Sequence, residues 1–163
     1  MKDKMSIMGI GPKLFLTTML YSFLLVLFTN HFKYKFAISF IHYRLLVVLG
    51  ILLIMIGIPL LVTSVIEIKE VYKADSLCVK GVYSVCRHPL YSSWIILIVP
   101  GITLLLNSWI LLSIPLIMYL AFRILIKQEE TFLQNKFGTD YLDYKNKVGL
   151  LFPKFWKYES KNE

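Results

Sequence analysis

A polar run from Asp75 to Tyr91 separates stretches that are almost continuously apolar. It contains Arg87, His88 and Tyr91, which offer a fixed positive charge, a titratable imidazole and a phenol. Pro89 lacks a backbone N–H and disfavours helical geometry at the residue before it, so the run is predicted to be a shaped loop opening into a helix. By itself the run is compatible with two roles: a site for chemistry, or a membrane-surface loop whose basic groups contact lipid headgroups.

A second polar motif follows two apolar runs. The runs, Leu90 to Leu106 and Trp109 to Ile126, are separated by a short Asn-Ser turn. Each is about long enough to cross a hydrocarbon core of roughly 30 Å, allowing for tilt and local thinning. Because so tight a turn returns the chain to the membrane face that it left, the hairpin is predicted to bring the polar run next to Glu129 and Glu130.

These motifs resemble the isoprenylcysteine carboxyl methyltransferase family and its phospholipid N-methyltransferase relatives. The resemblance covers about the C-terminal half of the chain and rests on the order and separation of the motifs. In this sequence they read Gly81-Val82-Tyr83, Arg87-His88-Pro89-Leu90-Tyr91, the apolar hairpin, Glu129-Glu130, and Phe137-Gly138-Thr139-Asp140-Tyr141-Leu142-Asp143-Tyr144. The resemblance implies an integral membrane enzyme that uses S-adenosyl-L-methionine.

The same resemblance implies which residues hold that cofactor. The expected cofactor-binding residues are Asp75, Ser76, Leu77, Cys78, Tyr83, His88, Pro89, Leu90, Tyr91, Glu129 and Glu130. Within this set the first of the two acids is expected on the polar head of the cofactor. Arg87 is a candidate for orienting the reactants, and no residue is assigned a catalytic role. The sulfonium is already an activated donor, so methyl transfer needs alignment and exclusion of water and requires no metal.

Two positions depart from the family pattern. Ser93 stands where many relatives have glycine two residues after the motif tyrosine, and it could crowd a close backbone approach. Leu125 stands where eukaryotic prenylcysteine enzymes carry an arginine that meets the substrate carboxylate. The acceptor therefore stays open between a prenylcysteine carboxylate and a phospholipid or other amine. Two further alternatives are a sterol-reductase-like enzyme that binds NADPH and a non-catalytic membrane protein of the same fold.

Composition places the chain among membrane proteins. Of its 163 residues 57% are hydrophobic and only 17% are charged, and its mean hydropathy is +0.66. The net charge of +8 could suggest nucleic acid, but the basic residues flank apolar spans and do not form a patch with stacking aromatics. The expected partners are a lipid bilayer and a lipophilic or lipidated substrate, with no nucleic acid.

The predicted fold is all-α: a bundle of about four transmembrane helices with a C-terminal amphipathic interfacial region. The first two spans are predicted at Leu14–Phe28 and Leu45–Ile66, and the hairpin supplies the other two. After the acidic pair, Gly138 is predicted to break the helix before a second, amphipathic helix. The chain is expected to form one membrane-embedded domain over residues 1–163, with the cofactor half at 67–153.

Basic residues predict the orientation of this bundle. Fifteen of them fall on one side of a four-span model: Lys2, Lys4, Lys13, Lys69, Lys73, Lys80, Arg87, Arg123, Lys127, Lys136, Lys145, Lys147, Lys154, Lys157 and Lys161. Three fall on the other: Lys33, Lys35 and Arg44. The excess predicts that the cofactor site faces the cytoplasm. Both cysteines, Cys78 and Cys86, then lie in a cytoplasmic loop and are expected to be free thiols packed in it.

Overall fold

The computed structural model describes residues 9–32 and 35–154. Within these ranges it contains helices and two isolated β-bridges but no strand. The helices are α1 (Gly11–His31), α2 (Tyr43–Lys73), α3 (Pro89–Ser92), α4 (Val99–Leu105) and α5 (Ser113–Lys147), with a π-helical turn at Ser93–Ile98 and 3₁₀ turns at Gly81–Ser84 and Trp109–Leu112. Five lysines that enter the predicted orientation lie outside the described residues: Lys2, Lys4, Lys33, Lys157 and Lys161.

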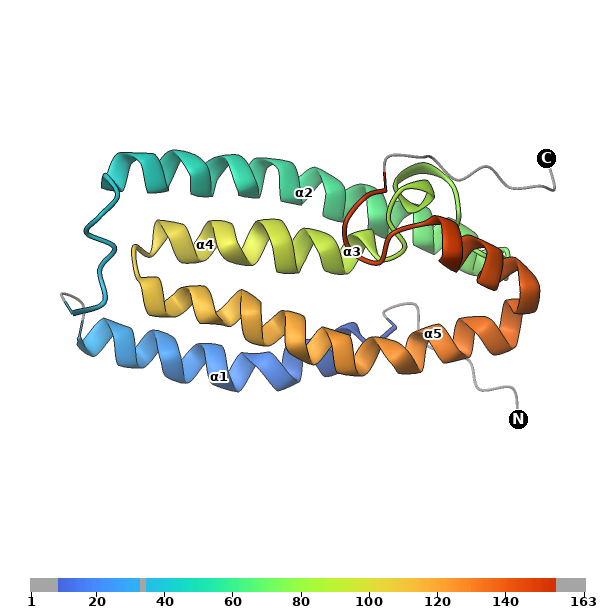
Figure 1. Cartoon of the computed structure of the whole chain (residues 1–163), viewed down its shortest axis with the longest axis horizontal. Helices are drawn as coiled ribbons and strands as arrows, with labels where there is room; N and C mark the ends of the chain where they lie inside the picture. Colours follow the sequence, from blue (N-terminus) through green and yellow to red (C-terminus); the bar gives the residue numbers. More distant parts are fainter. Residues whose placement is uncertain (1–8, 33–34, 155–163) are drawn as a thin grey trace.

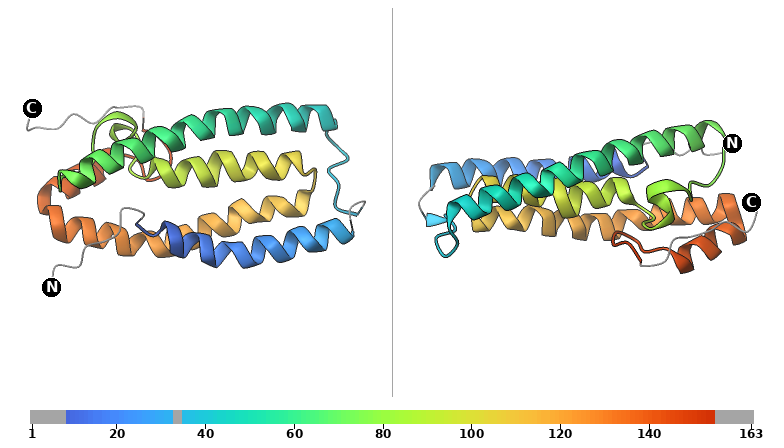
Figure 2. Two further views of the ribbon diagram at one scale, coloured as in Figure 1. Left: turned by 180° about the vertical axis from the view of Figure 1, so that it is seen from behind. Right: turned by 90° about the horizontal axis from the view of Figure 1, so that it is seen from above.

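The long helices run side by side, and the polar segments gather at one end of the bundle (Figure 1). α2 packs against α3, the π-helical turn and α4, while α1 packs against α5. The polar loop, the last part of α5 and the segment after it lie at the same end, as both views in Figure 2 show. The opposite end holds the turn between α4 and α5, where Trp109 N–H donates to Phe36 C=O at 3.0 Å. The chain therefore separates a polar end from an apolar bundle.

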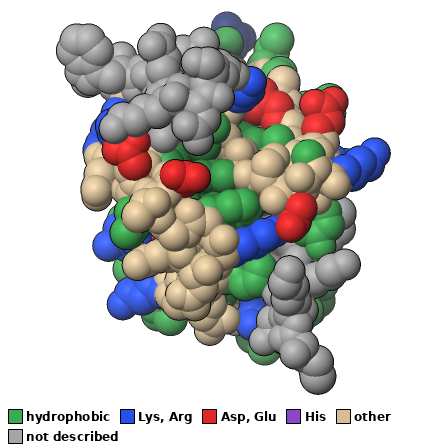
Figure 3. All heavy atoms as spheres, turned by 90° about the vertical axis from the view of Figure 1, so that its right-hand side faces the viewer, with side chains coloured by type: hydrophobic (Ala, Val, Ile, Leu, Met, Phe, Trp, Pro, Cys, Tyr) green, Lys and Arg blue, Asp and Glu red, His purple; other side chains and the backbone are tan. Residues whose placement is uncertain are grey.

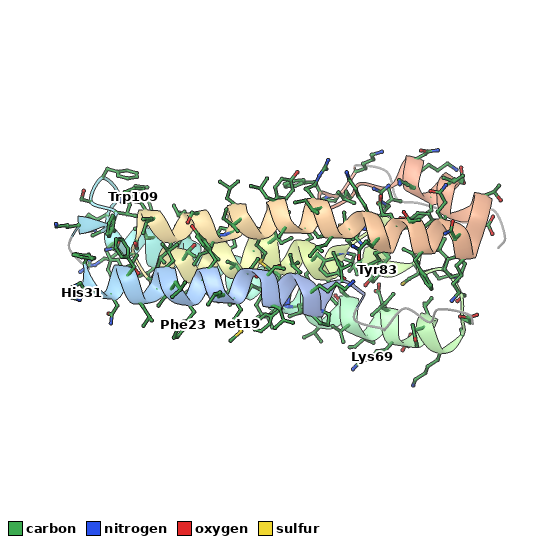
Figure 4. The ribbon with its side chains drawn as sticks, turned by 90° about the horizontal axis from the view of Figure 1, so that it is seen from below. Met19, Phe23, His31, Lys69, Tyr83 and Trp109 are labelled. Atoms are coloured by element: carbon green, nitrogen blue, oxygen red, sulfur yellow. The ribbon has the colours of Figure 1, made fainter. Side chains whose placement is uncertain are left out.

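In the part of the chain that the structure describes, three helical segments are long and apolar enough to cross a membrane: Gly11–His31, Tyr43–Lys73 and Trp109–Lys147. The apolar helix Pro89–Leu105 is shorter, about 25 Å at 1.5 Å per residue, and is compatible with a locally thinned or tilted span. Met19 and Phe23 point outward from α1 (Figure 4) and are more than half exposed. Such an extensive apolar surface suits lipid and not water. The predicted all-α bundle of about four spans is confirmed.

Small residues bring α2 and α4 close together. A Cβ atom on Gly50 would lie 2.8 Å from Gly101 C=O, and one on Gly101 would lie 2.7 Å from the side chain of Ile54. Without a strong hydrophobic drive between helices in lipid, such close backbone approach supplies the van der Waals contact that holds them. The π-helical turn precedes Pro100, which cannot donate a backbone hydrogen bond to the turn before it. The wider π-helical turn accommodates the missing hydrogen bond.

α5 changes direction at Gly138, where the sequence predicts a helix break. Gly138 has φ 57° and ψ −125°, a conformation that is accessible to glycine and strained for other residues. The helix resumes afterwards and buries Tyr141 and Tyr144, which pack with Val148 in a small cluster beneath the polar loop. The break lets the chain fold its last helical turns back over the end of the bundle.

Candidate active site

The hairpin brings the two polar motifs together, as predicted. Tyr91 O–H donates to Glu129 Oε2 at 2.9 Å, and His88 Nδ1 lies 3.5 Å from Glu129 Oε1. The backbone N–H of Ile10 also reaches this carboxylate, at 3.1 Å, and contacts the Tyr91 hydroxyl at 3.0 Å. Glu129 is thus held by groups from two distant parts of the chain, and its side chain is only 12% exposed.

Glu130 forms the centre of a second ionic group. Arg87 Nη2 lies 3.0 Å from Glu130 Oε1, and Lys145 Nζ lies 2.9 Å from Glu130 Oε2. Arg87 Nη1 also donates to Lys145 C=O at 2.5 Å, which links the polar loop to the end of α5. His88 Nε2 lies 3.8 Å from Glu130 Oε1, so the imidazole faces both carboxylates. Two acids, two fixed cations and one imidazole therefore form one continuous network.

Several buried polar atoms in this network lack hydrogen-bond partners within the part of the chain that the structure describes. They are Arg87 Nε, His88 Nε2, Tyr141 Oη and Glu130 Oε1; the last of these has the ion-pair contact with Arg87 Nη2 at 3.0 Å but accepts no hydrogen bond. A buried polar group without a hydrogen bond is costly, so a cluster of such atoms is typical of a site that a ligand completes. Donors and an acceptor are both present, as a zwitterionic amino-acid group would require. The residues therefore fit the polar head of S-adenosyl-L-methionine.

The segment Gly149–Leu151 holds the polar loop in place. Arg87 N–H donates to Gly149 C=O at 2.8 Å, and His88 N–H donates to Leu150 C=O at 3.2 Å. Ser92 O–H donates to Leu151 C=O at 2.7 Å. Because Pro89 cannot donate and the loop belongs to no sheet, these bonds satisfy backbone groups that would otherwise be unpaired. They fix the direction in which the arginine and histidine side chains leave the loop.

The earlier residues of the predicted cofactor set lie on other elements. Asp75 is mostly exposed and forms an ion pair with Lys136, and Ser76 next to it is also exposed. Leu77 packs against the tyrosine cluster of Tyr141 and Tyr144.

Tyr83 and Cys78 are buried, in contrast to Asp75 and Ser76. Tyr83 O–H donates to Ser64 C=O at 3.3 Å, and its own carbonyl accepts from Tyr144 O–H at 2.6 Å. This part of the loop thus bridges α2 and the last turns of α5. Within the motif after it, Pro89 is fully buried and Leu90 packs against the main core, so their side chains shape the site.

The charge of His88 is set by competing effects. Burial alone would lower its pKa, but hydrogen bonding and charge interaction with Glu129 and Glu130 more than offset it and raise the pKa from 6.5. Burial has the dominant effect on the two thiols of the loop. It raises the pKa of Cys78 to about 12 and that of Cys86 to about 11. Both cysteines are free and buried, as expected from the sequence.

The two departures from the family pattern occupy defined places. Ser93 is fully buried, and its hydroxyl donates to Leu90 C=O at 2.7 Å, within its own helix. The serine side chain is therefore turned back onto the backbone. Leu125 is partly buried against the core cluster that contains Phe122 and Ile126, so an apolar side chain fits there. The chain does not place a cation at that position.

The structure adds residues that the sequence analysis did not include in the site. Tyr141 lies in the motif that contains Gly138 and Lys145 directly follows that motif, and only the fold of the last turns of α5 brings them to Glu130. Ile10 reaches the site because Gly9, at φ 51°, turns the chain there. In the sequence, Pro12 at the start of α1 was the local signal that a helix begins at this point. Glu67 accepts from Val82 N–H at 3.1 Å and supports the 3₁₀ turn at the loop.

The polar end of the bundle shows acidic and basic side chains around an apolar centre (Figure 3). No histidine is visible among the described side chains of that face, in keeping with a His88 side chain only 5% exposed. The His88 side chain is thus shielded from water. A charged cluster shielded from water interacts more strongly with ligand charges than one on an open surface.

Comparison with known proteins identifies relatives of about half of this chain. The chain is 37% identical over 91 residues to protein-S-isoprenylcysteine O-methyltransferase of Mus musculus, covering 53% of this chain and 32% of the relative. The proteins of the same name from Saccharomyces cerevisiae and Xenopus laevis are 34% identical over 87 residues and 40% identical over 91 residues. These matches cover 53% of this chain in both cases, and 36% and 32% of the relatives.

The chain thus spans about a third of the length of these curated relatives. A family model described as phospholipid methyltransferase matches residues 45–140, which is more than half of the chain. The match includes the polar loop, the hairpin and both acids of the buried network. By this match the chain belongs to the phospholipid methyltransferase family.

Proposed function

We propose that the chain is an S-adenosyl-L-methionine-dependent membrane methyltransferase that acts on a lipophilic acceptor. The observation that carries the proposal is the buried network of Arg87, His88, Glu129 and Glu130, in which several polar atoms have no hydrogen-bond partner among the described residues. Family membership and the similarity to named O-methyltransferases support the same activity. The basic residues around this end of the bundle support a cytoplasmic orientation.

Each residue of the network has a role that its chemistry permits. Glu129 and Glu130 supply negative charge for the ammonium of the cofactor, and Arg87 supplies positive charge for its carboxylate. Tyr91 and Phe122, with ring centroids 5.4 Å apart, form the apolar wall beside this network and help to exclude water. S-adenosyl-L-methionine supplies, when bound, a methyl group that its sulfonium has already activated. The task of the protein is therefore binding and orientation, with no general base required for an anionic acceptor.

The expected acceptor is a lipidated carboxylate, because the relatives at 34–40% identity are named for isoprenylcysteine O-methylation. A phospholipid amine is the second candidate, and the family model named for phospholipid methylation favours it. The two differ in pH dependence. An amine must lose its proton before attack, so its methylation accelerates as pH rises, whereas a carboxylate is already ionised and needs no base. Rates with a prenylated cysteine analogue and with an aminophospholipid across pH distinguish them.

Cofactor binding tests the proposed activity directly. Calorimetry on the purified chain in detergent is expected to detect binding of S-adenosylhomocysteine and no binding of NADPH. Glu130→Gln should weaken that binding by about tenfold or more, since it removes a charge-assisted contact from a buried network. Glu70→Gln is the matched control, because Glu70 is an exposed acid near the end of α2. A well-folded sample that gives no heat with S-adenosylhomocysteine would overturn the proposal, and binding of NADPH in its place would indicate a reductase.

A further inference from the structure

A hollow of about 290 Å³ lies between α5 and the segment that follows it. Tyr119 and Arg123 line it from α5, and residues 149–154 line it from the other side. This segment runs back past α3 in Figure 1. The lining is mostly apolar, and among the described residues its only ionisable side chains besides the Tyr119 phenol are the two cations Arg123 and Lys154. The hollow therefore combines an apolar wall with a positive charge.

Arg123 is placed unusually for a charged residue. It lies within the candidate span of α5, three residues before the apolar run ends, and its side chain has no hydrogen bond or ion pair with any described residue. A charged residue in a spanning helix is costly and marks a functional site by default, and the partner to look for is an anion. Lys154, by contrast, already donates to Asn146 C=O at 3.0 Å. Arg123 is thus the cation available to a ligand.

The hollow is lined by a segment that also contributes to the polar network. Gly149 and Leu150 line the hollow, while their carbonyl oxygens accept from the N–H groups of Arg87 and His88. Along α5, Arg123 precedes Glu130 by seven residues, which places both on one helix face about 10 Å apart. A molecule in the hollow would therefore sit beside the network and closer to the membrane interior.

We propose that this hollow binds the anionic head of a single-chain amphiphile, the acceptor of the methyl group, with Arg123 as its counter-charge. That this amphiphile is the methyl acceptor rests on the proposed function, whereas its binding in the hollow does not depend on that function. The head takes a carboxylate or a phosphate, because Arg presents its donors in a planar fork that matches either anion. The volume holds a head and the start of a chain. The remaining chain follows the exposed Leu116 along the same face of α5.

The test uses the full chain in nanodiscs of phosphatidylcholine, without cofactor. The probes are N-acetyl-S-farnesylcysteine and its neutral carboxamide, whose affinities are compared at equal membrane mole fraction. The wild type should bind the carboxylate about tenfold more tightly than the amide. Arg123→Gln should remove this preference without changing the amide affinity, since a hydrogen-bonded charge contributes on this scale. Arg123→Lys should restore part of it, and Arg44→Gln, at an exposed arginine of α2, should leave it unchanged.

The outcomes separate this inference from the proposed function. A charge preference that survives Arg123→Gln, or an equal loss of affinity for both probes, would overturn the proposal. A second outcome concerns the lipid: phosphatidylglycerol, replacing part of the phosphatidylcholine, could abolish binding of the carboxylate probe in the wild type but not alter binding in Arg123→Gln. That result would assign the hollow to a bilayer phosphate and overturn its role as the acceptor site. Calorimetry with S-adenosylhomocysteine on the same samples reports the proposed function separately: its failure would leave an Arg123-dependent preference intact.

Discussion

Replacing Glu129 by glutamine removes one negative charge from the site and keeps the side-chain shape. The carboxylate accepts from Ile10 N–H at 3.1 Å and from Tyr91 O–H at 2.9 Å, and it faces His88 Nδ1 at 3.5 Å. A glutamine can keep its oxygen toward the first two donors, but its amide then faces His88 with a donor. The substitution therefore removes the contact with the imidazole and the charge available to a cofactor ammonium.

The expected size of the effect follows from the burial of this carboxylate. A hydrogen bond to a charged group contributes about 1.5–3 kcal/mol, and with a side chain 12% exposed there is little solvent screening to reduce it. We expect the cofactor Kd of Glu129→Gln to rise by about tenfold to a hundredfold. Because the carboxylate holds the polar head equally in the ground and transition states, kcat should change by less than about threefold.

The assay is calorimetry with S-adenosylhomocysteine, together with initial rates of methyl transfer at saturating cofactor. Glu67→Gln is the matched control, since Glu67 is also a partly buried acid that accepts a backbone N–H, from Val82 at 3.1 Å, but supports the loop from α2. Both variants should lose thermal stability, and only Glu129→Gln should lose cofactor affinity. If Glu129→Gln bound the cofactor normally but lost turnover, the binding role would be refuted and a catalytic one would replace it.

Three further predictions concern charge, backbone and orientation. The pKa of His88 is raised on folding, so protonated His88 stabilises the folded chain fully at pH values below the unfolded pKa near 6.5. This stabilisation is lost as pH rises through the higher folded pKa. The difference in melting temperature between the wild type and His88→Gln should therefore fall over that interval. Gly9→Ala should lower the free energy of unfolding by about 1 kcal/mol or more, because Gly9 has φ 51° and a methyl group there would overlap the Glu129 carboxylate. Gly11→Ala, in the first turn of α1, should be neutral or slightly stabilising. Denaturant unfolding of both variants checks this. A cysteine at Phe40, which is 81% exposed at the far end of the bundle, should react with an impermeant thiol reagent from outside the cell and one at Lys80 should not; the reverse labelling pattern would invert the orientation.

Sequence reasoning was sufficient where a feature depends on local chemistry or on length. The spans follow from runs of apolar residues, and the break at Gly138 follows from the conformational freedom of glycine. The meeting of His88 with Glu129 could also be predicted, because two spans joined by a tight turn must end on the same face. None of these features needs knowledge of how the helices pack.

Tertiary packing decided the rest of the site. Ile10 lies 119 residues from Glu129 in the sequence, and nothing local to either residue predicts that they meet. Lys145 reaches Glu130 only because the chain turns back after Gly138, and the sequence shows the break but not its direction.

The sequence by itself therefore determined the class of protein, its spans and the two motifs of its site. The structure decided which parts of the predicted cofactor set share a network, since Asp75 pairs with Lys136 while Arg87 and His88 face the acids. It also decided where the hollow beside Arg123 lies. The physical reason is that spans are set by the transfer of single segments into lipid, whereas contacts between distant segments depend on packing that no single segment encodes.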